Sequence, residues 1–87
     1  MAYWETGEGR VLHGGTAVLS SDQIVLHAAS GGGRRGLRAF VPCGCLPAGL
    51  RRRTAVEIML DDGRRGRFVV ADRRPGLLCL NSRGPLR

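Results

Sequence analysis

Lysine is absent from this 87-residue chain, and all fourteen basic residues are arginine. In a Gly- and Ala-rich sequence this bias is typical of GC-rich coding. The alternative is selection for guanidinium, which forks onto phosphate or carboxylate with two parallel hydrogen bonds. Composition leaves both explanations open. Seven acidic residues bring the net charge to +7, which favours a polyanionic partner such as nucleic acid, a nucleotide or an acidic protein surface.

Long apolar runs and a secretory leader are also lacking. No run approaches the ~18 residues that cross a bilayer, and the first residues lack the basic and apolar regions of a signal peptide. Cysteine is scarce and odd in number, unlike the even framework of a small secreted fold. We therefore expect a cytoplasmic protein that does not insert into membranes.

Groups that carry out catalysis are sparse. Asp61 and Asp62 precede Gly63 in a turn pattern, and neither histidine has a recognisable catalytic spacing. The sequence therefore predicts a non-enzymatic binding module that needs no cofactor.

Zinc is the one metal that the sequence brings into consideration. Cys43, Cys45 and Cys79, with either His13 or His27, could supply four ligands. The single residue between the first two cysteines is a tighter spacing than the usual two to four residues, and no second cysteine pair follows. We interpret these cysteines as small packing residues and predict no metal site.

Turn signals every 8 to 12 residues separate short β-type runs, and no segment has a helical period. Residues 54–60 form the clearest strand, and the Asp-Asp-Gly loop after it predicts a hairpin with residues 64–71. The register places Val56 opposite Phe68 and Glu57 opposite Arg67, which separates apolar from charged faces. We predict an all-β fold, a small six-stranded antiparallel barrel with little or no helix.

The predicted boundaries follow composition. Residues 1–15 are rich in glycine and charge, which predicts a flexible arm with at most a short strand at 10–13. Residues 16–80 form the single barrel domain, beginning with a hairpin that turns at 20–23, and residues 81–87 form a frayed tail. Phe40 and Phe68 are expected in the core, which leaves few aromatic side chains for stacking on bases.

The arginines fall into three clusters. The second and third lie at opposite ends of the predicted hairpin, about 20 Å apart at about 3.3 Å per residue, so we expect no single compact pocket. Each cluster is either a solvated surface or part of a surface that follows phosphates. The clusters are Arg34, Arg35 and Arg38; Arg51, Arg52 and Arg53; and Arg64, Arg65 and Arg67.

The order of features over residues 16–80, about three quarters of the chain, resembles a divergent PilZ domain. The matching stretches are residues 17–26, the Leu-Pro-Ala-Gly step at 46–49, the strand pair 54–60 and 67–71, and the closing strand 77–80. That resemblance implies a six-stranded barrel in a bacterial cytoplasm that takes part in cyclic di-GMP signalling.

PilZ domains commonly bind cyclic di-GMP through an Arg-x-x-x-Arg arm and an Asp/Asn-x-Ser-x-x-Gly turn. Ser20 fits the serine of the turn, while Val18 and Gln23 stand where the family has an acidic residue and glycine, and no Arg-x-x-x-Arg precedes them. The resemblance therefore implies a degenerate member that acts through protein contacts or retains a partial nucleotide site. The ligand-binding candidates are Arg10, Ser20, Arg34, Arg35 and Arg38.

Other small barrels compete with that reading. Residues 56–72 resemble the central strand pair of Sm-like RNA-binding folds, which implies binding of RNA or DNA through Arg51 to Arg53 and Arg64 to Arg67. Residues 16–41 resemble the start of a pleckstrin-like or GRAM-like domain, but no closing helix follows. A signalling adaptor that pairs an exposed strand edge with another protein is the remaining alternative. Oligomeric state stays open.

Overall fold

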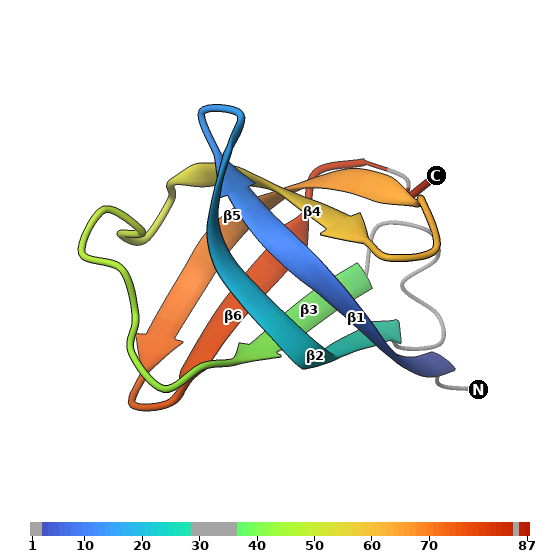
Figure 1. The fold of residues 1–87 in the computed structure, drawn as a ribbon, viewed down its shortest axis with the longest axis horizontal. Coiled ribbons are helices and arrows are strands. Elements are labelled where there is room, and N and C mark those ends of the chain that lie inside the picture. The colour runs from blue at the N-terminus through green and yellow to red at the C-terminus, as the bar shows by residue number, and fades with distance from the viewer. Residues whose placement is uncertain (1–2, 29–36, 85) are drawn as a thin grey trace.

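Six antiparallel strands close into a barrel in the order β1-β2-β3-β6-β5-β4 (Figure 1). This computed structural model describes residues 3–28, 37–84, 86 and 87. The predicted all-β, six-stranded barrel is confirmed. No helix that could span a membrane occurs in the described part of the chain. The strands are β1 (Tyr3–His13), β2 (Thr16–Ala28), β3 (Leu37–Pro42), β4 (Ala55–Leu60), β5 (Arg65–Arg74) and β6 (Leu77–Ser82).

The first strand begins at the start of the described chain, so the prediction of a flexible arm over residues 1–15 was wrong. β1 pairs with β2 from Tyr3 opposite Ala28 to His13 opposite Thr16. Gly14 and Gly15 join the two strands, with φ of 62° and 83°. Two positive φ values in a two-residue loop are what a type I′ hairpin requires, and glycine adopts them without steric cost. The barrel therefore includes the segment that was assigned to an arm.

Residues 20–23 form an irregularity within β2, where a hairpin turn was predicted. Gly7 pairs with Ile24 and Gly9 with Ser21, so two residues of β2 oppose a single residue of β1. The Gln23 backbone N–H donates to Ser21 Oγ at 3.1 Å. Such a bulge bends the strand locally. Beyond it, β2 pairs with β3, from Val25 onward.

The β4–β5 hairpin has the predicted register. Val56 lies opposite Phe68 and Glu57 opposite Arg67. Gly63 has a φ of 99°, and the Leu60 backbone N–H donates to the Arg64 carbonyl oxygen at 2.8 Å. The three-residue loop with a left-handed glycine is confirmed.

Among the described side chains, alternation along each strand fills the barrel with aliphatic groups and one aromatic ring. The prediction for Phe68 is confirmed, since it is 1% exposed, whereas the prediction for Phe40 was wrong. Phe40 is half-buried and lies between Ala39 and Val41, which both face inward, so its ring is on the outer surface. The buried core residues are Val11, Ile24, Leu26, Ala39, Val41, Leu50, Val56, Ile58, Leu60, Phe68, Val70, Leu78 and Leu80.

The C-terminal residues are paired rather than frayed, which corrects the predicted tail. β6 runs to Ser82, and the Arg83 backbone N–H donates to the Arg67 carbonyl oxygen at 2.8 Å. The Arg87 backbone N–H donates to the Arg65 carbonyl oxygen, also at 2.8 Å. Leu86 packs against the core. The end of the chain therefore runs beside β5, along the edge with which β6 pairs.

Candidate functional site

Arg64 is neutralised by two carboxylates. Its guanidinium donates to both carboxylate oxygens of Glu5 on β1 and, through Nε, to Asp62 Oδ2 at 2.9 Å. The Arg64 backbone N–H also donates to Asp62 Oδ1 at 3.0 Å, and this bond, followed by the side-chain bond, lowers the pKa of Asp62. The carboxylate of Glu5 raises the pKa of Arg64. Arg64 therefore ties the β4–β5 loop to β1 and is not available to a ligand.

Two further arginines have acidic partners close to them in sequence or register. Arg65 Nη2 donates to Glu57 Oε1 at 2.6 Å across the hairpin. Arg74 Nε donates to Asp72 Oδ2 at 3.1 Å, which lowers the pKa of Asp72 together with a bond from the Arg73 backbone N–H. These are exposed pairs, and such pairs contribute little to stability.

One surface hollow of about 490 Å³ is lined by three arginines that form no ion pair with the described side chains: Arg53, Arg67 and Arg83. Arg67 and Arg83 are neighbours on β5 and at the end of β6, joined by a backbone hydrogen bond. An adjoining hollow shares Arg67 and Arg83 and adds Arg65 and Arg87. Glu57 is the one carboxylate residue that lines either hollow. We call the five arginines the arginine face.

The expectation that the arginine clusters stay apart is therefore correct only in part. Arg53 and Arg67 come from different clusters and line the same hollow. They meet because Arg67 lies opposite Glu57, in the middle of the hairpin rather than at its loop. Arg51 and Arg52 are exposed and line neither hollow.

The backbone of Arg53 has an unusual conformation. Its φ of 71° is the only positive φ of a non-glycine residue in the part of the chain that the structure describes. The Arg53 N–H donates to the Val70 carbonyl oxygen at 2.7 Å, and the Thr54 N–H donates to the Arg51 carbonyl oxygen at 3.1 Å. A left-handed arginine costs roughly 1–2 kcal/mol, and residues held in such conformations cluster at functional sites.

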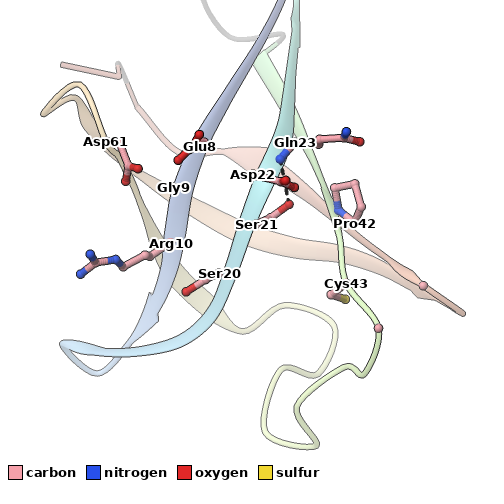
Figure 2. A pocket seen from close by; sticks show the side chains of 12 residues that line it. Glu8, Gly9, Arg10, Ser20, Ser21, Asp22, Gln23, Pro42, Cys43 and Asp61 are labelled. Carbon is pink, nitrogen blue, oxygen red and sulfur yellow. Dashed lines mark hydrogen bonds between the residues drawn. The ribbon is translucent and has the colours of Figure 1, made fainter.

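Arg10 and Ser20, candidates for a cyclic dinucleotide, lie directly opposite each other in the β1–β2 ladder. Both line a hollow of about 780 Å³ (Figure 2). In Figure 2 the guanidinium of Arg10 extends to the side of β1 away from Cys43. The same hollow is lined by three carboxylate residues, Glu8, Asp22 and Asp61. Its charge therefore suits an anionic ligand poorly.

The remaining dinucleotide candidates are elsewhere. Arg38 is exposed on β3, between His27 of β2 and Asn81 of β6, and it does not line the hollow beside Ser20. Arg34 and Arg35 lie outside the described residues. The structure thus brings together two of the five residues that the PilZ resemblance selected.

The cysteines are free thiols in different surroundings. Cys45 is exposed, whereas Cys43 and Cys79 are half-buried, and burial is the largest cause that raises the pKa of each. Among the described residues, no three or more His, Cys, Asp or Glu side chains are grouped in a way that could hold a metal ion. The alternative of a zinc site finds no support in this geometry.

Sequence reasoning missed Arg83 and Arg87 as members of the arginine face, because the end of the chain was assigned to a frayed tail. It also missed a surface pair of rings: Trp4 is 62% exposed, and its ring centroid lies 4.0 Å from that of His27. A strand over residues 3–13 would have placed Trp4 on a face of the sheet, but Gly7 and Gly9 interrupt the alternation of side chains by which a strand is identified. Comparison of the chain with protein-family models, with curated proteins and with solved structures finds no match, so no family is assigned to it.

Proposed function

We propose that the protein is a non-enzymatic module that binds nucleic acid, RNA or DNA, through phosphate contacts on the arginine face. One observation carries the proposal: Arg53, Arg67 and Arg83 line a single hollow, and none of the three forms an ion pair with a described side chain. Guanidinium stays charged at all physiological pH values and forks onto phosphate with two hydrogen bonds. A chain of phosphates is the ligand that relieves the mutual repulsion of several such groups.

The distribution of carboxylates supports the choice of this surface over others. Arg64 and Arg74 are paired with carboxylates, and the hollow beside Ser20 is lined by more acidic than basic residues. The two hollows of the arginine face are lined by five arginines and by one acidic residue, Glu57. The net charge of +7 attracts polyanions to the whole molecule, and this surface concentrates that attraction.

Charge removal tests the proposal. The triple variant Arg53→Gln, Arg67→Gln, Arg83→Gln is expected to lose at least about tenfold in affinity for labelled RNA or DNA in fluorescence anisotropy. The magnitude of the slope of log affinity against log salt, measured between about 50 mM and about 200 mM, should fall by about 2. The reason is that binding releases fewer counterions when phosphate contacts are lost.

The matched control removes three arginines from other parts of the surface: Arg51→Gln, Arg52→Gln, Arg74→Gln. Both variants have the same net charge, so the control should keep most of the affinity and of the salt slope. Equal losses in the two variants would show that net charge alone drives binding. Absence of binding by the native chain at low salt would contradict the proposal outright.

A cyclic di-GMP site at Arg10 and Ser20 is the second candidate. It is favoured by the position of these residues opposite each other beside one hollow, and by the six-stranded barrel that a PilZ-like domain implies. We rank this candidate below nucleic-acid binding, because three carboxylate residues line the hollow and would repel the phosphates of the ligand. Titration calorimetry with cyclic di-GMP is expected to give no binding heat. Binding that Arg10→Ala and Ser20→Ala each abolish would reverse this ranking.

A further inference from the structure

Four outward-facing residues on neighbouring strands form a continuous row across the barrel wall. Trp4 of β1 pairs with His27 of β2, His27 pairs with Arg38 of β3, and Arg38 pairs with Asn81 of β6. Directly opposed residues on adjacent strands point to the same face, and strands lie about 4.8 Å apart, so the row spans about 14 Å. We call it the aromatic row. It crosses the start of β1, the end of β2, the start of β3 and the end of β6.

The rings at one end of the row leave a flat apolar surface in water. The indole of Trp4 lies over the imidazole of His27, with centroids 4.0 Å apart and ring planes tilted by 31°. Trp4 is nevertheless 62% exposed, and it is the one exposed large hydrophobic residue among those described. One face of the indole is therefore supported by His27, while much of the ring is open to solvent. An aromatic ring held in this way is a stacking surface for a planar group.

A second row of outward-facing residues crosses the same four strands beside the first, and none of its members is charged. Thr6 pairs with Val25, Val25 with Phe40, and Phe40 with Cys79. Phe40 and Val25 are half-buried on the outer side of the barrel, so they give the aromatic row an apolar flank.

The other end of the row leads to the arginine face. Arg38 is exposed and makes no ion pair among the described side chains. Asn81 lies near the end of β6, and Arg83 follows it two residues later, one residue beyond the strand, where its backbone N–H still bonds to β5 at Arg67. Two residues of extended chain span about 6.6 Å. Arg83 in turn adjoins Arg67. A path thus runs from exposed rings, past the guanidinium of Arg38 and the amide of Asn81, to three arginines that have no ion pair within the described part of the chain.

We infer that the nucleic acid is single-stranded and lies across the strands, with a base stacked on Trp4 and phosphates on Arg38 and the arginine face. This inference rests on the proposed function and narrows its ligand class. Bases in a duplex are stacked on one another, so an exposed ring on a convex barrel reaches them only in a single strand. Stacking accepts any base, so little sequence preference is expected.

Intrinsic fluorescence tests the stacking directly, because Trp4 is the chain's only tryptophan. Titration with oligothymidylate of about ten nucleotides, within the site sizes of small single-strand-binding barrels, is expected to quench its emission. Trp4→Ala should weaken binding of that oligonucleotide by about 5- to 100-fold, the loss of one stacked base, and leave binding of a blunt DNA hairpin nearly unchanged.

Trp4→Phe keeps a stacking ring and should recover much of the lost affinity, while Thr6→Ala, at an exposed position two residues along β1, should bind as the native chain does. Suppose that the native chain binds and the arginine triple variant does not, while emission stays constant and Trp4→Ala binds normally. The proposed function then stands and the stacking inference fails. If the native chain binds neither the oligothymidylate nor the DNA hairpin, the proposed function and the stacking inference are both rejected. Loss of hairpin and single-strand binding to the same degree in Trp4→Ala would also overturn the inference.

Discussion

Phe68→Ala is expected to lower the free energy of unfolding by about 3–5 kcal/mol, the usual cost of removing a buried aromatic ring and leaving a cavity. Phe68 is 1% exposed and is the largest fully buried side chain among the described residues. A domain of this length has roughly 4–13 kcal/mol of stability in total. Denaturant unfolding followed by far-UV circular dichroism should therefore show a much lower midpoint. At the low end of that stability range, a large fraction is unfolded even without denaturant.

Phe40→Ala is the matched control, because it removes the same ring from the outer side of the barrel. Phe40 is half-buried, so its loss is expected to cost about 1 kcal/mol, the centre of the usual range for point mutants. Comparable losses in the two variants would contradict the assignment of the two rings to opposite faces of the wall.

Gly9→Ala is expected to destabilise the barrel by about 1–3 kcal/mol, the usual cost of overpacking. At positions with room for a methyl group, the same substitution stabilises a protein, because alanine lowers the conformational entropy of the unfolded chain. Gly9 is buried in β1 at the point where that strand passes β4. A Cβ there would lie 2.6 Å from the Met59 carbonyl oxygen and 3.1 Å from the Cα of Leu60. Both are backbone atoms, so relief requires β1 and β4 to separate. Thermal melting would detect the loss.

Gly7→Ala provides the comparison within the same strand. A Cβ at Gly7 would meet no heavy atom within 4 Å, and its φ is not in the left-handed region. The reduced entropy of the unfolded chain should then stabilise the protein by about 0.4–1 kcal/mol. If Gly9→Ala were as stable as Gly7→Ala, the close approach of β1 to β4 would be contradicted.

The sequence predicted the β4–β5 hairpin down to its register, because local signals agreed there. Residues 55–60 form a β-type run whose inward positions Val56, Ile58 and Leu60 are all apolar, and Gly63 stands at the one loop position that needs a positive φ. When the periodicity of a segment and the residues of its turn favour the same structure, tertiary contacts do not have to overcome a local preference for another one.

The N-terminal half was harder to predict, for two physical reasons. Gly7 and Gly9 have no side chains, so β1 lacks the apolar alternation that identifies a strand, even though Gly9 is there because β4 passes close by. In β2, the polar residues 20–23 have the composition of a turn, but Gly14 and Gly15 had already reversed the chain. A double glycine is itself a hairpin signal, but it directly follows a segment rich in glycine and charge, which hid it.

Little of the candidate site could be predicted, because it depends on how the barrel closes. Arg67 and Arg83 are sixteen positions apart in sequence and become neighbours only through the pairing of β5 with β6. Trp4 and Arg38 are joined through β2 in the same way. Which arginines keep an acidic partner is also a tertiary property, as Glu5 and Arg64 show.

Closure of the wall has a kinetic consequence. The ring is completed by β1 against β4, with Gly9 opposite Leu60, and by β3 against β6, with Arg38 opposite Asn81. Such distant pairings must overcome the entropy of closing long loops, and barrels of this kind fold on the order of milliseconds to seconds. During synthesis, the β1–β2 hairpin emerges well before β4 and β6. Until they arrive, Val11, Ile24 and Leu26 have no opposite wall to pack on, and the nascent chain is most prone to aggregate.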